Sequence, residues 1–363
     1  MQKRRIEWID VWKGMLILFV VFGHVVGAMA HTQYASAPVS RFFNAVYHAV
    51  YLFHMPAFFV VAGWLWKRFA GEPLRERFVQ RAKRLIVPYF IWGFASAAVF
   101  VVSKSLVGGC MASGGYYNVG MVDFIWYRPF FSILHAGGWP DGEGFRCNSV
   151  LWFLPCMFVV LMAYDWIARL FASRRSKRLD IALFITGFII QWFMPRQLPW
   201  GLSRAPSMLA FFAFGRLLRN GGFADRIKLR FILCCVGWVA VALIGWWCWR
   251  NQGLYFSSRK PQWFVYAAAA GVFGSVVSMV CARAVGGSAS GCVLAKTGRY
   301  SLGIMLLHKF FLVFVQFLLF PVLAAHSIVV WSAVAVVATV SVAVLSFFAA
   351  RFCAKALPFA MGE

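Results

Sequence analysis

The stretch WIDVWKGMLILFVVFGHVV, residues 8–26, places an acid, a cation and an imidazole within an apolar run. An α-helix turns about 100° per residue, so Lys13 and His24 lie on one face, about 16 Å apart along the axis. Asp10 lies on nearly the same face, within reach of Lys13. Because imidazole accepts a proton near neutral pH, the spacing predicts a polar track with His24 as a general base at its deep end.

Each of these residues also has a simpler interpretation. Asp10 is equally suited to be a helix-start acid near the positive end of the helix dipole. Lys13 can extend its ammonium toward the lipid headgroups. His24 can make a structural hydrogen bond to another helix, but a buried ionisable group in a membrane helix costs free energy unless it faces a partner or cavity. We therefore favour a functional role for His24.

Two further histidines are expected at a similar depth. His54 lies in YLFHMPAFFVVAGWLWKR, residues 51–68, and His308 lies in TGRYSLGIMLLHKFF, residues 297–311. Each is about eight residues from one end of its apolar run, which places all three imidazoles in the middle third of a bilayer. Taken singly, His54 and His308 are slightly better explained as packing residues. Together with His24 they predict a shared polar chamber.

A dense basic cluster follows the second apolar run, in RERFVQRAKRLIVPYFIWG, residues 75–93. Such charges stop translocation and contact anionic lipid, which is a sufficient explanation for any single member. Two or three members, among them Arg81 and Arg84, can instead clamp a phosphate-bearing ligand, because guanidinium groups bind phosphates through paired hydrogen bonds.

The elements that must position these residues are membrane helices. Of 363 residues, 62% are hydrophobic and 13% are charged, too few polar residues to cover a water-soluble globule. A hydrocarbon core about 30 Å thick needs about 20 apolar residues per helix. We expect an all-α, polytopic integral membrane protein with about ten transmembrane helices. The expected spans are residues 11–30, 46–66, 85–106, 149–170, 180–195, 205–219, 231–249, 262–283, 300–320 and 327–350.

The basic residues predict how this bundle is oriented. The chain has 36 Lys and Arg against 11 Asp and Glu, and most of the cations fall in alternate loops between the apolar runs. The positive-inside rule then places both termini in the cytoplasm. Because the charges lie in short loops, they do not indicate nucleic-acid binding, and the expected partners include membrane lipids.

Other classes of site have little support in the sequence. The nine cysteines show no CxxC spacing and no pattern with histidine, so no metal is expected. There is no Walker loop and no dinucleotide-binding glycine fingerprint. Cys110 and Cys147 bracket the long loop 107–148 and are candidates for a disulfide if that face is oxidising. No loop is long enough for a separate core, so residues 1–363 are expected to form one domain, whose oligomeric state the sequence leaves open.

Five stretches, in order, resemble the signatures of the acyltransferase-3 family of membrane-bound O-acyltransferases, particularly its fucose-4-O-acetylase-like branch. They are RIEWIDVWKGMLILFVVFGH, FHMPAFFVVAGWLWKR, RAKRLIVPYFIWG, SVLWFLPCMFVVL and GRYSLGIMLLHKFF, and they reach from the N-terminus to about residue 311. The family motif is a basic residue, ten intervening positions and a histidine, which Lys13 and His24 fill here. Arginine is frequent at the first position, so Lys13 keeps the charge but lacks the bidentate fork.

The resemblance implies ten membrane helices and acyl-CoA, most simply acetyl-CoA, as a cytoplasmic donor. It also implies transfer of the acyl group to a hydroxyl of a cell-envelope glycan or lipid-linked sugar, in the plasma (inner) membrane of a bacterium. Lys13, oriented by Asp10, would then hold the donor phosphates with Arg81 and Arg84. Within residues 1–363 we expect no counterpart of the extracytoplasmic hydrolase-like domain that some relatives append.

In this interpretation His24 accepts the proton of the sugar hydroxyl, and an acyl-histidine intermediate is a variant of the same mechanism. His54 and His308 would orient His24 or donate a hydrogen bond to the oxyanion. The alternative is a multi-spanning transporter or flippase of a sugar-containing substrate, with the midplane histidines as proton relay or substrate ligands. No internal repeat is visible in the sequence, which weakens this alternative.

Overall fold

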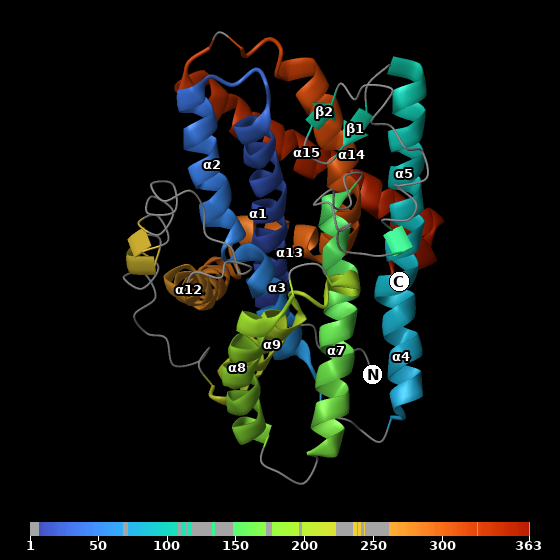
Figure 1. The fold of residues 1–363 in the computed structure, drawn as a ribbon, viewed down its shortest axis with the longest axis vertical. Helices are drawn as coiled ribbons and strands as arrows, with labels where there is room; N and C mark the ends of the chain where they lie inside the picture. The colour runs from blue at the N-terminus through green and yellow to red at the C-terminus, as the bar shows by residue number, and fades with distance from the viewer. Residues whose placement is uncertain are drawn as a thin grey trace.

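The computed structural model is a helical bundle, apart from one small hairpin (Figure 1). It describes residues 7–67, 72–107, 110–112, 115–117, 133–134, 148–171, 176–195, 198–222, 235–237, 239–240, 243, 261–324 and 326–362. The hairpin pairs β1 (Cys110–Ala112) with β2 (Gly115–Tyr117) in antiparallel register, Met111 opposite Tyr116. The expected all-α class is therefore confirmed, with these two strands as an addition.

The helices follow the apolar runs of the sequence. They are α1 (Glu7–His31), α2 (Ala37–Tyr51), α3 (His54–Leu65), α4 (Leu74–Arg81), α5 (Val87–Val107), α7 (Phe153–Leu170), α8 (Ser176–Phe193), α9 (Ala205–Asn220), α12 (Pro261–Val285), α13 (Ala289–Arg299), α14 (Ser301–Leu319) and α15 (Ile328–Ala356). A five-residue π-helical stretch, Ala82–Ile86, joins α4 to α5. Short 3₁₀ turns are η3 (Ser149–Trp152), η4 (Pro199–Gly201) and η5 (Pro358–Met361).

Six segments of the described chain are long and apolar enough to cross a membrane. They are Glu7–His31, Ala37–Leu65, Ser149–Leu170, Phe264–Val285, Ser301–Leu319 and Ile328–Ala356. This agrees with an integral membrane protein; the count of ten and the cytoplasmic termini stay predictions. The expected span 231–249 and the pairing of Cys110 with Cys147 lie largely outside the described residues.

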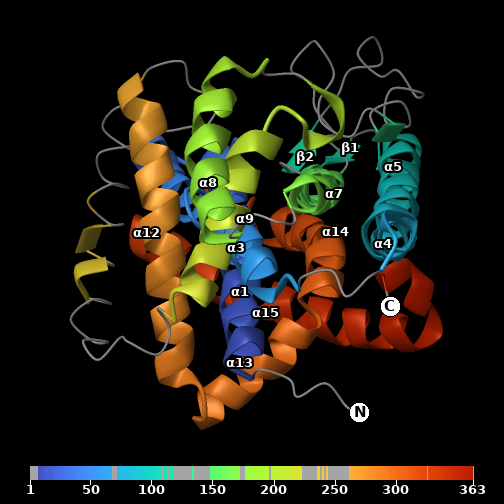
Figure 2. The same cartoon turned by 90° about the horizontal axis from the view of Figure 1, so that it is seen from below.

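Helix α1 is the centre of the bundle. It contacts α2, α3, α12, α13, α14 and α15, and its apolar window is the most buried of the six candidate spans. Figures 1 and 2 show that the helices do not all run in one direction: α5 and α7 are upright in Figure 1 and end-on in Figure 2, whereas α12 shows the reverse. A side chain on the inner face of α1 is thus surrounded by several helices from distant parts of the sequence.

Two pairs of glycines bring helices into backbone contact. A Cβ on Gly298 of α13 would lie 1.9 Å from the Asp10 carbonyl oxygen of α1, and one on Gly14 would lie 2.0 Å from the Leu294 carbonyl oxygen. Helices α3 and α9 meet in the same way through Gly63 and Gly215. Small residues permit such close packing, which is how membrane helices associate without a hydrophobic driving force between them. The first contact fixes the end of α1 that carries Lys13.

The expected second span, 46–66, is broken into two helices. Helix α2 ends at Tyr51 and α3 begins at His54, with Leu52 and Phe53 between them. The Val50 carbonyl oxygen at this break accepts hydrogen bonds from the Phe53 amide at 3.4 Å and from His54 Nδ1 at 2.6 Å. Non-helical backbone inside a membrane protein is tolerated where other groups satisfy its polar atoms. The break places Tyr51 and His54 beside α1.

Candidate active site

The three histidines singled out in the sequence meet inside the bundle. His24 of α1 and His308 of α14 have ring centroids 5.2 Å apart, and both His308 and His54 are fully buried. His54 joins them through Tyr51, whose ring lies 4.7 Å from that of His54 and 5.5 Å from that of His24. His24 is 8% exposed, so its ring faces the protein interior. We call these four residues the histidine cluster.

Tyr51 is the member that the sequence analysis missed. Its hydroxyl lies 3.1 Å from His24 Nδ1 and 2.9 Å from His24 Nε2, so one phenol reaches both nitrogens of the candidate base. In the sequence, Tyr51 precedes His54 by three positions, a spacing that would put both side chains on one helical face. The helix break, which the sequence did not reveal, instead lets both residues contact the region around His24.

The backbone determines how the other two imidazoles carry their protons. His54 Nδ1 lies 2.6 Å from the Val50 carbonyl oxygen, and His308 Nδ1 lies 3.0 Å from that of Ile304. A carbonyl oxygen can only accept, so each Nδ1 carries the hydrogen and each neutral ring presents a lone pair on Nε2. Within the described residues, neither Nε2 has a hydrogen-bond partner although both are buried. These two atoms are therefore open acceptors for a ligand.

This geometry restricts one of the expected roles. A neutral His54 or His308 with its proton on Nδ1 cannot donate from Nε2 to an oxyanion; only the imidazolium form could. Lys309, the residue after His308, is 4% exposed and carries a second basic group into this region. We therefore assign His54 and His308 the acceptor role, and oxyanion donation by either stays a prediction that this arrangement disfavours.

The expected ion pair at the start of α1 is present. Lys13 Nζ lies 2.6 Å from Asp10 Oδ1, and Arg299 of α13 brings its Nε to 4.0 Å from Asp10 Oδ2. The Lys13 side chain is 21% exposed, whereas the carboxylate is 5% exposed. The buried Asp10 carboxylate thus holds the Lys13 ammonium in place, and the Lys13 side chain keeps access to solvent.

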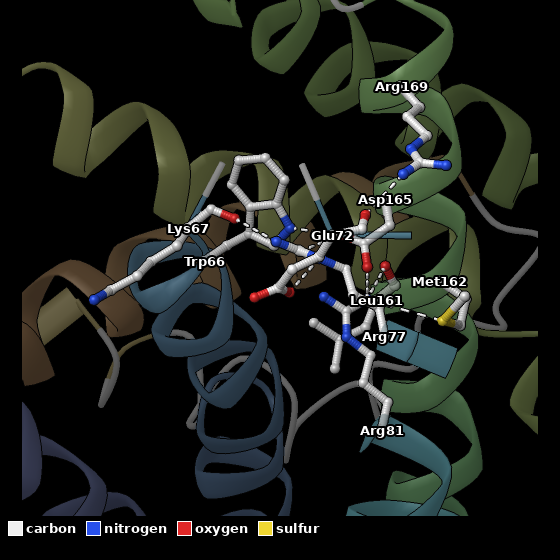
Figure 3. A network of polar contacts seen from close by, with 9 residues as sticks. All are labelled: Trp66, Lys67, Glu72, Arg77, Arg81, Leu161, Met162, Asp165 and Arg169. Atoms are coloured by element: carbon white, nitrogen blue, oxygen red, sulfur yellow. Dashed lines mark hydrogen bonds and ion pairs between the residues drawn. The ribbon is translucent and has the colours of Figure 1, made fainter. Parts of the chain in front are cut away.

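The two arginines expected to join Lys13 lie elsewhere. Arg81 Nη1 forms an ion pair with Asp165 of α7 and donates to the Leu161 carbonyl oxygen at 2.6 Å (Figure 3). Arg84 is exposed in the π-helical stretch. In both Figures 1 and 2, α4 lies beside α7 or α5 and away from α1, so the structure does not bring Arg81 to Lys13. Donor binding by Arg81 and Arg84 stays a prediction.

Asp165 organises this second polar network. Its fully buried carboxylate accepts from Trp66 Nε1 at 2.8 Å and from Arg77 Nη1 at 3.2 Å, in addition to the Arg81 pair. Burial lowers the pKa of the Arg81 guanidinium, and the Asp165 carboxylate opposes that shift. Figure 3 shows Trp66 and the two arginines converging on this one side chain. A buried acid in an apolar helix was the available sequence signal, and it was not used.

A family model described as an acyltransferase domain matches residues 6–351, nearly the whole chain. The chain belongs to this acyltransferase family. Two bacterial proteins called nodulation protein NolL are similar over shorter stretches. The protein from Sinorhizobium fredii is 33% identical over 87 residues and that from Mesorhizobium japonicum is 33% identical over 106. These matches cover 23% and 27% of this chain and only 22% and 26% of the relatives. No solved structure matches the chain significantly.

The membrane acyltransferase thus has an enclosed imidazole in contact with a phenol, and a cation at the other end of the same helix. Among the described residues, no group of three or more His, Cys, Asp and Glu side chains has the arrangement of a metal site. The groups at hand can accept a proton, orient a hydroxyl and hold an anion.

Replacing Tyr51 with phenylalanine is expected to lower kcat of the acyltransferase about 10- to 100-fold, because the ring that keeps its packing loses the hydroxyl that orients His24. The KM for the acyl donor should stay unchanged, since Tyr51 contacts α1 at Gly23 and His24, and His24 lies about 16 Å along the helix from Lys13. Steady-state kinetics of the purified protein measure both constants. Tyr300→Phe, at a half-buried tyrosine of the α13–α14 junction, is the matched control. A wild-type kcat for Tyr51→Phe would remove Tyr51 as a positioning residue.

Proposed function

We propose that this membrane acyltransferase moves an acetyl or similar acyl group from acyl-CoA to a hydroxyl of a cell-envelope glycan or lipid-linked sugar, as in the fucose-4-O-acetylase-like branch. The observation that carries the proposal is the enclosed His24 ring, in contact with Tyr51 and His308, on the same helix as the solvent-accessible Lys13. The bacterial relatives support a bacterial plasma membrane as its location.

The donor has two chemically different ends. Its phosphates are strongly hydrated anions that belong near the cytoplasm, whereas its pantetheine arm is slender enough to reach between helices. Lys13 is separated from His24 by eleven residues, about 16 Å along a helix. An ammonium held by Asp10 at the entrance can bind phosphate while the thioester reaches the histidine cluster. Phosphate binding by Lys13 and proton transfer by His24 would account for a cation and a base about 16 Å apart on one helix face.

The proton transfer can be followed at named atoms. A hydroxyl of the acceptor donates its proton to a nitrogen of His24 while its oxygen attacks the thioester carbonyl. When the tetrahedral intermediate collapses, the carbon–sulfur bond breaks and the imidazolium returns the proton to the leaving thiolate. Tyr51 orients the ring throughout by its hydrogen bond. Charges and atoms balance without a second nucleophile.

The open acceptors of His54 and His308 support a polyhydroxyl acceptor. Each Nε2 is buried without a hydrogen-bond partner among the described residues, and an unpaired buried polar atom costs free energy. A sugar has several hydroxyl donors next to the one that is acylated, and two of them can satisfy these atoms. A site built to pair with hydroxyls rejects analogues that lack them.

The overall proposal is tested by comparing envelope glycans from cells with and without the protein by mass spectrometry. We expect one glycan species to lose an acyl mass increment without the protein and to regain it when the wild-type gene is restored. Restoration with His24→Ala should not return the acyl group. An unchanged glycan profile, together with altered distribution of a glycan across the membrane, would favour the transporter alternative.

Replacing Lys13 with alanine is expected to raise the KM for acyl-CoA about tenfold or more with a small change in kcat, because a charged contact to phosphate is lost far from the chemistry. Lys13→Arg should restore donor binding, since it keeps the charge. The measurement is the rate of acyl transfer as a function of acyl-CoA concentration. Lys355→Ala, at an exposed lysine of α15, is the control. A KM equal to that of the wild type would exclude Lys13 from donor binding.

A further inference from the structure

Arg204 is a cation near the histidine cluster that the mechanism above leaves unused. It lies directly before α9, with its guanidinium carbon 4.5 Å from the ring centroid of Trp152. Its side chain is exposed, and the protein around it lowers the pKa of the guanidinium. The guanidinium is therefore accessible to a ligand.

Arg204 has no anionic partner within the described part of the chain. The neighbours on which its charge acts are the phenols of Tyr51 and Tyr47 and the thiol of Cys156. By contrast, Arg81 and Arg216 are paired with the buried carboxylates Asp165 and Asp180. An accessible guanidinium that is backed by an aromatic face and lacks a carboxylate is suited to bind an anion.

Arg204 and the expected donor site lie near different parts of α1. Tyr47 packs against Gly27 of α1, and Tyr51 packs against Gly23. Both glycines flank His24 on α1 at the end remote from Lys13, which lies about 16 Å away from His24. Arg204 acts on Tyr47 and Tyr51, and its neighbour Trp152 lies in η3, which contacts α14, the helix of His308. Arg204 therefore lies near the histidine cluster, whereas Lys13 lies about 16 Å along α1 from His24.

A strained turn holds Arg204 in this place. Trp200 has φ = 57°, and it is the only residue other than glycine with a positive φ among the described residues. The next residue, Gly201, has φ = 70°, and a Cβ there would lie 2.5 Å from Cys156 Cβ of α7. Left-handed backbone at a bulky residue costs about 1–3 kcal/mol and persists where the surroundings impose it. The turn is packed against α7 at Cys156, and Gly201 lies three residues before Arg204 in the chain.

We propose that Arg204, backed by Trp152, binds an anionic group of the acceptor, a phosphate or a carboxylate attached to a sugar, and so places a neighbouring hydroxyl beside His24. This inference rests on the proposed function, since it assigns the substrate class of the same reaction. The donor binds at Lys13 and the acceptor at Arg204.

The test compares sugars that differ in charge. Purified full-length protein in detergent is titrated with glucose 1-phosphate, methyl glucuronide, neutral methyl glucoside and inorganic phosphate, and the shift in thermal unfolding midpoint gives each Kd. We expect at least one anionic sugar to bind about tenfold or more tightly than methyl glucoside. The first two ligands distinguish a phosphate from a carboxylate. Arg204→Gln should remove the preference, and Arg204→Lys should retain part of it.

Arg41→Gln, at an exposed arginine of α2, is the matched control and should bind all four ligands as the wild type does. The proposal is overturned if no anionic sugar binds the wild type, or if Arg204→Gln and Arg204→Lys both keep the preference. Acetyl transfer from acetyl-CoA to the same sugars separates the two proposals. Arg204-dependent binding without transfer to any acceptor contradicts the proposed function alone. Transfer without any preference for anionic sugars contradicts the Arg204 site alone.

Discussion

Replacing His24 with alanine is expected to lower kcat for acyl transfer about 100- to 10,000-fold, the usual contribution of a general base. A sugar hydroxyl is a weak nucleophile until its proton is removed during attack, and His24 is the buried ring that contacts both Tyr51 and His308. The measurement is transfer of a labelled acetyl group from acetyl-CoA by purified protein in lipid vesicles. His24→Gln, which keeps hydrogen bonding without a basic nitrogen, should be similarly inactive.

The comparison needs a histidine outside the cluster. His326 is exposed between α14 and α15, and His326→Ala should retain wild-type kinetics. Thermal unfolding of both variants establishes that the fold is intact. Normal turnover by folded His24→Ala would show that another group removes the proton, and His308, with its open Nε2, would become the first candidate.

The largest expected effect on stability comes from Asp165. Replacement with alanine leaves Arg77 and Arg81 without their buried counter-ion and the Trp66 indole without an acceptor. Breaking a buried ion pair by removing one partner costs about 3–5 kcal/mol. We expect the free energy of unfolding in detergent to fall by that amount for Asp165→Ala, and by less for Asp165→Asn, which keeps the shape and one acceptor oxygen.

Glu72→Gln is the matched control for this network. Glu72 Oε2 lies 3.4 Å from Arg77 Nε, but the Glu72 side chain is 47% exposed. An exposed ion pair contributes at most about 1 kcal/mol, so this variant should unfold close to the wild type. Equal losses for Asp165→Ala and Glu72→Gln would mean that the buried carboxylate is not what secures α4 to α7. A stable Asp165→Ala protein with a raised KM for acyl-CoA would instead indicate that the arginines bind donor.

The sequence predicted the shared face of Lys13 and His24 because helical periodicity is a local property. Lys13 and His24 lie on one face of α1 whatever the rest of the fold, and the depth of each histidine follows from the length of its apolar run. The ion pair between Asp10 and Lys13 depends only on an i, i+3 spacing, and it is present. The structure then placed His24, His54 and His308 within one cluster, as the shared depth had suggested.

Partners from distant segments could not be predicted in this way. Tyr51 reaches His24 only because a helix breaks at Leu52, within an apolar run that reads as one continuous span. Arg81 is paired with Asp165, 84 positions away, because α4 packs against α7. A basic cluster in the sequence shows the sign of the charge, but it does not show which carboxylate forms an ion pair with each guanidinium.

The sequence by itself determined the class of this protein: an apolar, helical membrane chain whose motifs resemble an acyltransferase family, with a basic residue and a histidine on one helix face. Only the tertiary structure decided which groups surround that histidine, which ring nitrogens stay open and which arginines are already paired. The physical reason is that hydrophobicity and helical spacing are set along the chain, whereas hydrogen bonds and ion pairs between helices depend on how the helices pack.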